Sequence, residues 1–238
     1  MSYCILCHEP IKQEVSWHDL VFKIDQQKVC SACHESFAYI EGDVCKVCGR
    51  PLAELANKYK HGDSCYDCIR WEEDIRWQGV LMKNRSIYLY NDFMKEKLNL
   101  FKFRGDFMIA HAFKQPIQAC FNMYFNENDY IMPIPLSEER LYERGFNQAT
   151  ALASLLELPI LNPLSRTHHE KQSKKSRMER LQSTNVFTMN EDHRNELNNK
   201  CVLLIDDIYT TGSTVRHAAE VLRQAGAKSV SSLTLVRG

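Results

Sequence analysis

Cysteine is crowded into the N-terminal third of the chain, and this crowding constrains the fold more than any other feature. Eight of the ten cysteines precede residue 70, and they form four C-x-x-C pairs: Cys4/Cys7, Cys30/Cys33, Cys45/Cys48 and Cys65/Cys68. The N-terminus, MSYCILCHEP, lacks the basic and apolar segments of a secretory signal, so a cytoplasmic location is expected. Thiols stay reduced there, and the pairs therefore predict zinc sites. A disulfide framework and redox-active pairs are the alternatives.

The spacing of the pairs predicts two structural zinc sites with four cysteine ligands each. Zinc takes four soft ligands in a tetrahedron, and a C-x-x-C knuckle supplies two of them with little chain strain. His8, His34 and His61 lie close by, but the eight thiolates already fill two sites, and a four-cysteine site leaves no open position for catalysis. Sequential sites are favoured over interleaved ones, which gives the ligand sets Cys4, Cys7, Cys30, Cys33 and Cys45, Cys48, Cys65, Cys68.

These cysteines define a small N-terminal zinc-binding module, residues 1–79, which is followed by a second domain, residues 80–238. The module contains few large apolar side chains before residue 70, so bound metal would replace part of the missing core. The segments that begin at Cys30 and Cys65 are typical of helix starts, and Gly49 follows a knuckle where the backbone needs conformational freedom. Each site is thus expected to join a knuckle to a helix.

The second domain alternates helix-type and strand-type segments, as judged from the spacing of apolar residues. The predicted elements are, in order, a helix over 105–125, a strand over 130–135, a helix carrying Leu141, Ala149, Leu152 and Leu156, a strand over 200–205, a helix over 215–225 and a strand over 229–236. The continuous apolar run over 200–205 is typical of a central parallel strand. This alternation predicts an α/β fold in which helices flank a parallel sheet.

The stretch VLLIDDIYTTGST, residues 202–214, joins a buried strand to a helix through two acids and a hydroxyl-rich loop. Asp206 and Asp207 are predicted at the carboxyl end of the strand, where parallel sheets bind ligands. The loop would offer amides and hydroxyls to an anion, and it consists of Thr210, Thr211, Gly212, Ser213 and Thr214. Acids beside a phosphate cradle predict a sugar phosphate with Mg²⁺. The alternative is a plain strand-to-helix turn with a capping threonine.

This stretch resembles the 5-phosphoribosyl 1-pyrophosphate (PRPP) signature of type I phosphoribosyltransferases. The resemblance implies a type I phosphoribosyltransferase-like fold, preceded by the small zinc-binding domain. It implies that Asp206 and Asp207 hold the ribose hydroxyls and Mg²⁺ during chemistry at ribose C1, while the loop holds the 5′-phosphate. Within MPIPLSEERLYERGFNQA (132–149), Arg140 and Arg144 would bind the diphosphate, and Gly145 would allow a close approach. The basic segment 165–183 would be a lid.

A closer resemblance covers nearly the whole chain. The motifs PIPL and RGFNQA, LFKFRGD (100–106), the PRPP signature and the cysteine knuckles are together similar to the ComFC branch of the ComF family of competence proteins. This resemblance implies a role in DNA uptake during natural transformation, with contacts to single-stranded DNA, the competence helicase ComFA and other DNA-processing proteins. The lid departs from the family pattern Q-x-x-L…E-R-x-x-N, because Lys175 and Ser183 stand where leucine and asparagine are expected.

Two functions stay open: a PRPP-dependent transferase, and a non-catalytic adaptor that binds DNA and partners with the same fold. The formal net charge is zero, which argues against a globally basic nucleic-acid binder, and no apolar run is long enough to cross a membrane. Lys102 and Arg104 either add positive charge to the site or lie at a solvated helix end. The side chains that would either stack bases or pack between the domains are Trp71, Trp77, Lys83, Arg85, Tyr88 and Tyr90.

Overall fold

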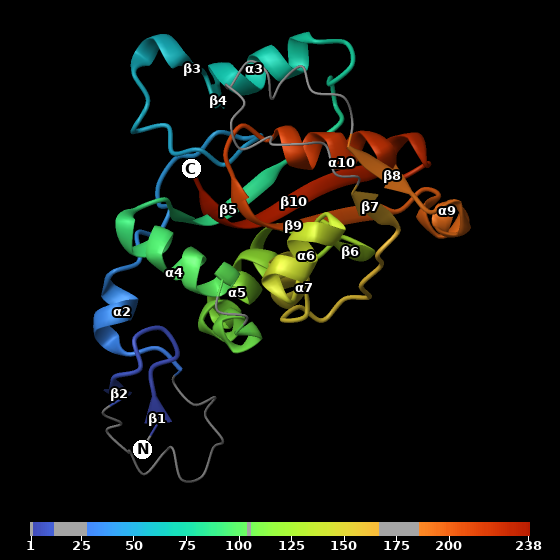
Figure 1. The fold of residues 1–238 in the computed structure, drawn as a ribbon. Coiled ribbons are helices and arrows are strands. Elements are labelled where there is room, and N and C mark those ends of the chain that lie inside the picture. Colours follow the sequence, from blue (N-terminus) through green and yellow to red (C-terminus); the bar gives the residue numbers. More distant parts are fainter. Residues whose placement is uncertain (1, 12–27, 104–105, 167–185) are drawn as a thin grey trace.

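A four-stranded parallel sheet forms the centre of the molecule (Figure 1). The computed structural model describes residues 2–11, 28–103, 106–166 and 186–238. All neighbouring strands of the sheet are parallel. Their order is β5 (Asn84–Leu89), β10 (Ser229–Arg237), β9 (Cys201–Tyr209) and β6 (Tyr130–Pro133). The predicted α/β fold with a parallel sheet is therefore confirmed.

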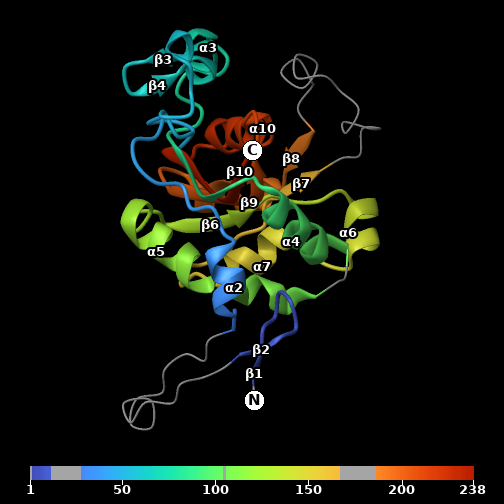
Figure 2. The same ribbon diagram turned by 90° about the vertical axis from the view of Figure 1, so that its left-hand side faces the viewer.

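Helices cover both faces of this sheet. They are α4 (Asp92–Phe103), α5 (Lys114–Tyr124), α7 (Gln148–Ala153) and α10 (Ser213–Gln224). Successive residues of a strand point to opposite faces, so Leu203 and Ile205 of β9 pack with α4, α5 and α7, whereas Val202 and Leu204 pack with α10. Figures 1 and 2 show α10 on one side of the sheet and the other three helices on the opposite side. Burial on both faces explains the continuous apolar run.

Shorter elements complete the described chain. In the N-terminal part they are β1 (Ser2–Tyr3), β2 (Pro10–Ile11), α2 (Ser31–Glu35), η1 (Asn57–Tyr59), β3 (Lys60–His61), β4 (Ser64–Cys65) and α3 (Tyr66–Glu73). Further along they are η2 (Phe107–Phe113), α6 (Glu138–Arg144), β7 (Leu164–Arg166), β8 (Phe187–Met189), η4 (Glu191–His193) and α9 (Arg194–Leu197). The antiparallel pairs are β1 with β2, β3 with β4, and β7 with β8. Within the described ranges, none of the helices has the length and apolar character needed to cross a membrane.

Two helix predictions differ from the structure in detail. The segment predicted as one helix over 105–125 is η2, a 3-10 helix, followed by α5. Pro116 lies in the first turn of α5, where its missing amide hydrogen is tolerated. The single helix predicted after the strand at 130–135 is two helices, α6 and α7. Gly145 ends α6 with a left-handed φ of 75°, and the Asn147 side chain caps α7 by accepting from the Ala149 amide.

The aromatic side chains at the junction of the two predicted domains pack inside the molecule. Trp71, Trp77 and Tyr88 are only 6%, 3% and 0% exposed, respectively. Tyr88 lies in β5, an edge strand that the sequence analysis did not predict. The interpretation that nucleic-acid bases stack on these three rings is therefore wrong, and the alternative, packing inside the protein, is correct. Tyr90, just after β5, is 46% exposed.

The described residues of the cysteine-rich N-terminal part share the two apolar layers of the central sheet and do not form a separate core. Cys4 and Phe37 belong to the apolar layer of α4, α5 and α7, and Cys45 belongs to the layer of α10. In both views the β1–β2 hairpin and the β3–β4 hairpin lie at opposite ends of the molecule, with the sheet between them (Figures 1 and 2). The two halves of the cysteine-rich part thus dock on different faces of the central sheet, while the boundary near residue 80 stays a prediction.

Candidate functional site

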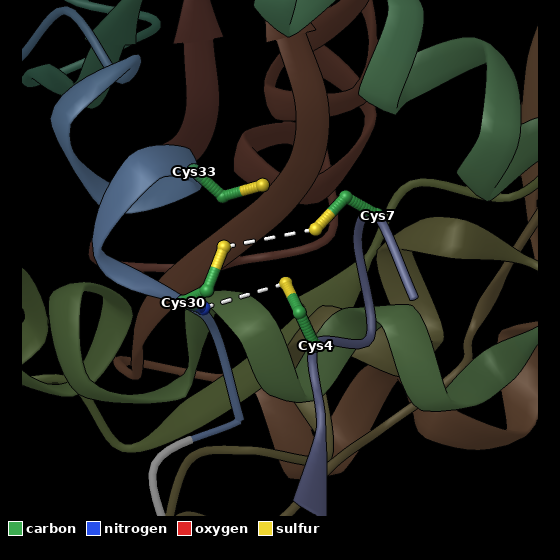
Figure 3. Close-up of side chains that lie close together, drawn as sticks. All are labelled: Cys4, Cys7, Cys30 and Cys33. Atoms are coloured by element: carbon green, nitrogen blue, oxygen red, sulfur yellow. Dashed lines mark hydrogen bonds between the residues drawn. The ribbon is translucent and has the colours of Figure 1, made fainter. Parts of the chain in front are cut away.

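The eight N-terminal cysteines converge into two clusters, each assembled from two C-x-x-C knuckles. In each cluster the four sulfurs lie within 4.8 Å of one another. The first cluster is Cys4, Cys7, Cys30 and Cys33 (Figure 3), and the second is Cys45, Cys48, Cys65 and Cys68. The sequential arrangement is therefore confirmed. All ten cysteines lie in the described part of the chain, and none of them forms a disulfide.

The sulfur positions of both clusters fit zinc. A tetrahedral site with Zn–S distances of about 2.3 Å places neighbouring sulfurs about 3.8 Å apart. The Sγ atoms of Cys7 and Cys30 are 3.6 Å apart in the first cluster, and those of Cys48 and Cys65 are 3.6 Å apart in the second. The donor set and its spacing therefore support structural zinc at both places.

Backbone amides stabilise thiolates in the two clusters in the same way. The Cys30 amide donates to Cys4 Sγ at 3.4 Å, and the Cys65 amide donates to Cys45 Sγ at 3.3 Å. A hydrogen bond to the charged form of a thiol favours that form, which is the form that binds metal. Cys30 and Cys65 also directly precede α2 and α3, so the prediction that each site joins a knuckle to a helix is confirmed.

A pocket of about 280 Å³ opens beside the second half of β9 and is called the β9 pocket below. Its walls bring together residues from α4, α6, β7, β9 and the loop into α10. The lining residues are Lys102, Ile134, Leu136, Arg140, Arg144, Arg166, Asp206, Asp207, Ile208, Thr210, Thr211, Ser213 and Thr214. Both predicted acids, both predicted arginines and four of the five predicted loop residues thus meet around one cavity.

The two acids of this pocket differ in electrostatic environment. They lie inside β9 rather than after it, because β9 keeps pairing with β10 as far as Tyr209. Lys102 Nζ forms an ion pair with Asp207 Oδ2, and the Asp207 amide donates to Asp206 Oδ1 at 2.9 Å. Burial, reinforced by the charge of Asp207, raises the pKa of Asp206 to about 8. Near neutral pH Asp206 therefore binds a proton, which a cation or a hydroxyl donor in the pocket would displace.

The loop from β9 to α10 needs glycine at its centre. Gly212 adopts a left-handed φ of 80° directly before α10, and a Cβ there would overlap the Tyr209 hydroxyl and the Arg216 guanidinium. At the start of the loop, Arg237 at the end of β10 donates from Nη1 to the carbonyl oxygens of Tyr209 at 3.1 Å and Thr210 at 2.8 Å. The loop is thus held from behind at the N-terminus of a twelve-residue helix, where amides and the helix dipole favour an anion.

Four cations line the pocket together with the two acids, namely Lys102, Arg140, Arg144 and Arg166. Burial lowers the pKa of Arg144, an effect that the charge of Asp207 partly offsets. Burial, with Arg140 next in effect, lowers the pKa of Arg166. Guanidinium groups that are desolvated and repel one another are stabilised when an anion enters the pocket. The pocket therefore suits a ligand that carries several negative charges and also has hydroxyl groups for the acids.

Some of these positions were missed or left open by the sequence analysis. Arg166 is the last residue of β7 and lines the pocket. In the sequence it is one of several basic residues in the segment 165–183, and only the pairing of β7 with β8 sets it apart from the others. Lys102 lies at the site rather than at a solvated helix end. Arg104 and most of the predicted lid, with Lys175 and Ser183, lie outside the described residues. Gly145 is not among the lining residues and ends α6 instead.

Comparison with known proteins relates both parts of the chain to known families. Residues 108–238 match the family model of the phosphoribosyl transferase domain, and residues 2–69 match that of the double zinc ribbon domain. The chain is 43% identical over 236 residues to the competence protein ComFC of Bacillus subtilis, which covers 98% of this chain and 94% of the relative. It is 33% identical to ComFC of Streptococcus pneumoniae, covering 98% and 99%. It is 31% identical to the DNA utilization protein YhgH of Escherichia coli K12, covering 88% and 96%.

Proposed function

Because the chain belongs to the ComFC family of competence proteins, which joins a double zinc ribbon to a phosphoribosyl transferase domain, we propose that it binds PRPP together with Mg²⁺ in the β9 pocket. We further propose that it serves the uptake or processing of transforming single-stranded DNA. The first proposal comes from the pocket itself, and the second comes from the names of the relatives.

The observation that carries PRPP binding is the meeting of three kinds of group in one pocket. The loop 210–214 offers amides and hydroxyls at a helix N-terminus, Asp206 and Asp207 offer carboxylates, and Arg140 and Arg144 offer positive charge. PRPP carries a phosphate, ribose hydroxyls and a diphosphate, one for each kind of group. The acids would hold the ribose hydroxyls and Mg²⁺, which neutralises charge on the leaving diphosphate when bound.

The contribution of the protein to phosphoribosyl transfer would be positioning and electrostatics. Arg140 and Arg144, with Arg166 and Lys102 beside them, would stabilise the negative charge that builds on the departing diphosphate. The loop would hold the 5′-phosphate and the acids would hold the ribose hydroxyls. The ribose would then be fixed so that a nucleophile approaches C1 from the face opposite the diphosphate. No strong base in the chain is required for this step.

Thermal unfolding with and without PRPP and Mg²⁺ tests the binding proposal, because a ligand that binds only the native state stabilises it. We expect PRPP with Mg²⁺ to raise the Tm, and we expect the double variant Asp206→Asn/Asp207→Asn to fold but show no shift. A matched double variant at two exposed acids, Asp43→Asn/Asp192→Asn, should retain the shift. An unchanged shift in the pocket variant would sink the proposal.

Release of pyrophosphate separates the transferase from the adaptor. A transferase should release pyrophosphate from PRPP when supplied with its acceptor, for which single-stranded oligonucleotides and nucleobases are the candidates to test. Stabilisation by PRPP with no release under any of these conditions would favour the adaptor, in which the fold only binds phosphates. The loss of release in Arg144→Met, with Tm unchanged, would place that arginine on the diphosphate.

The DNA-related part of the proposal concerns partners in the cytoplasm: single-stranded DNA, the helicase ComFA and other DNA-processing proteins. It rests on relatives that are named for competence and for DNA utilization. Binding of a labelled oligonucleotide should weaken steeply with salt if phosphate contacts carry it. Transformation assays with the Asp206→Asn/Asp207→Asn variant test whether the pocket is needed for DNA uptake. Normal transformation in that strain would show that it is not.

A further inference from the structure

A side chain of the second cysteine cluster reaches the loop at the β9 pocket. Trp71 lies in α3, three residues after the cluster ligand Cys68, and is almost completely buried. Its Nε1 donates a hydrogen bond to the carbonyl oxygen of Thr211 at 3.2 Å. Trp71 is separated from Thr211 by most of the chain, so only docking of α3 on the sheet creates this contact.

The direction of this hydrogen bond determines where the next amide points. None of the peptide bonds between the described residues is cis, and in a planar trans peptide the carbonyl and the following N–H point in opposite directions. With the Thr211 carbonyl held toward α3, the Gly212 amide points away from α3. Arg237 holds the carbonyls of Tyr209 and Thr210 in the same manner. Three successive carbonyls, those of Tyr209, Thr210 and Thr211, are thus held by side chains from outside the loop.

A buried cation lies between the second cluster and the loop. Arg216, in the first turn of α10, is 0% exposed. Its guanidinium is 4.6 Å from the centre of the Trp71 ring, and Nη1 donates to the Tyr209 hydroxyl at 2.7 Å. Nε and Nη2 have no hydrogen-bond partner among the described residues.

Compensation for this buried charge comes in part from the cluster. Burial lowers the pKa of Arg216, but Tyr209 and the thiolates of Cys68 and Cys48 outweigh it, so the net pKa is raised. Four thiolates around one divalent ion carry a net negative charge, and an uncompensated buried cation would be strongly destabilising. Arg216 therefore lies against Trp71, which follows the cluster in α3, and against Gly212 of the loop, where an added Cβ would overlap its guanidinium.

We propose that the second four-cysteine cluster is a structural part of the phosphate site: its fold places Trp71 and Arg216 as positioning residues that hold the loop 210–214 in the conformation that receives the 5′-phosphate. This inference rests on the proposed PRPP function. It predicts that damage to the contact weakens binding of the ribose 5-phosphate end of the ligand and spares binding of the diphosphate end, which Arg140 and Arg144 would hold.

Calorimetric titration of the full-length, zinc-loaded protein with ribose 5-phosphate and, separately, with pyrophosphate, both with Mg²⁺, tests the proposal. Trp71→Phe keeps most of the ring and removes the N–H. A net hydrogen bond corresponds to a factor of about 3 to 10 in affinity. We expect ribose 5-phosphate to bind more weakly by that factor and the affinity for pyrophosphate to stay within about twofold.

Trp77→Phe is the matched control. Trp77 is equally buried and packs edge-on against Trp71, with ring centroids 5.1 Å apart, but no hydrogen bond joins it to the loop. The same substitution there should lower the Tm and leave both affinities unchanged. Equal weakening of both ligands in Trp71→Phe, or no weakening of either, would overturn the inference. If wild type binds neither ligand, the proposed function itself fails, which is a different result.

Substitutions of Arg216 give an independent experiment, in which the rate of zinc release to a chelator is measured without a sugar ligand. Arg216→Met removes the buried charge beside the thiolates, so we expect a chelator to remove zinc from the second cluster several times faster, with the first cluster unchanged. Arg216→Lys keeps the charge and should restore slow zinc release, while ribose 5-phosphate binding stays weak because the bond to Tyr209 is lost. Zinc release at the wild-type rate in Arg216→Met would contradict the coupling. Should Trp71→Phe fail to fold, Arg216→Lys carries the affinity test.

Discussion

The two cysteine clusters are built from the same local pattern and differ in what surrounds it. In both, the amide of the first cysteine donates to the carbonyl five residues later: Cys4 to Glu9 at 2.9 Å, and Cys45 to Arg50 at 2.8 Å. In both, a C-x-x-C pair leads into a helix. The second cluster is fully buried, whereas two cysteines of the first are partly exposed.

The difference that matters lies just outside the ligand sets. The third residue after the last ligand is Trp71 in the second cluster and Ser36 in the first. Trp71 donates a hydrogen bond to the loop of the β9 pocket, while the hydroxyl of Ser36, the residue after α2, donates to the Ala32 carbonyl oxygen of that helix. If the proposed role of the second cluster holds, the same kind of cysteine cluster supports a ligand site in one copy and only stabilises the chain in the other, and the difference comes from side chains that are not cluster ligands.

Loss of one ligand from each cluster should give the largest effect on this comparison. Structural zinc contributes an apparent binding free energy of about 10–16 kcal/mol in small zinc domains, so Cys65→Ser should unfold the second cluster and abolish the Tm shift with PRPP. Cys30→Ser, at the equivalent position, should release zinc from the first cluster and keep the shift. Zinc content by mass spectrometry and thermal unfolding measure both. Equal loss of the PRPP-dependent Tm shift in both variants would show that the two clusters do not differ in their effect on the β9 pocket.

Gly49→Ala should give the next largest effect. Gly49 has a φ of 69°, and a left-handed conformation costs an L-residue about 1–2 kcal/mol. An added Cβ would also lie 3.0 Å from the Asn84 carbonyl oxygen in β5. We expect a loss of roughly 2 kcal/mol in the free energy of unfolding, measured by urea denaturation. His8→Ala, at the equivalent place in the first cluster, should change stability little, because His8 is already left-handed.

Titration should separate the contribution of the pocket from that of the cluster. The pKa of Asp206 is raised to about 8, so its ionised fraction increases about tenfold between pH 7 and pH 9. Because Mg²⁺ and ribose hydroxyls favour the ionised carboxylate, the affinity for ribose 5-phosphate with Mg²⁺ should rise over this range, with zinc content constant. Asp206→Asn should bind weakly at every pH. A flat wild-type profile would show that the proton on Asp206 does not oppose binding.

His8→Gly should give the smallest effect and the opposite sign. His8 follows Cys7 as Gly49 follows Cys48, and its φ of 64° is left-handed without the freedom of glycine. Glycine removes that strain and adds entropy to the unfolded chain, so the net gain is about 0.5 kcal/mol. A loss of stability in chemical denaturation would mean that the imidazole makes a contribution to the first cluster that outweighs its backbone strain.

Much of the fold and of the candidate site was predictable because it depends on short-range pattern. The ligand sets follow from C-x-x-C spacing, and the central strand β9 follows from its continuous apolar run. The acids and the loop of VLLIDDIYTTGST lie on consecutive residues, so a strand followed by a helix is enough to bring them together. The strand end was misjudged, since β9 runs to Tyr209 where β10 still offers partners.

Other features had no local pattern to reveal them. β5 contains Asn84, Arg85 and Ser86; it pairs with β10 along the backbone, and Asn84 and Ser86 add side-chain hydrogen bonds with Ser232 and Thr234 of β10. The break between α6 and α7 depends on one glycine and one cap. These elements depend on tertiary hydrogen bonds or on single backbone angles, which apolar periodicity does not record.

The sequence by itself determined the chemistry of this protein: which eight thiolates can hold metal, which acids and hydroxyls lie side by side, and which segments can form a parallel sheet. Each of these depends on residues close together in the chain. Only the tertiary structure decided that Lys102 and Arg166 line the β9 pocket, and that Trp71 and Arg216 connect one cluster to its loop. Contacts between residues so far apart in sequence arise from how helices dock on the sheet, and docking is selected by the fit of whole buried surfaces rather than by any one motif.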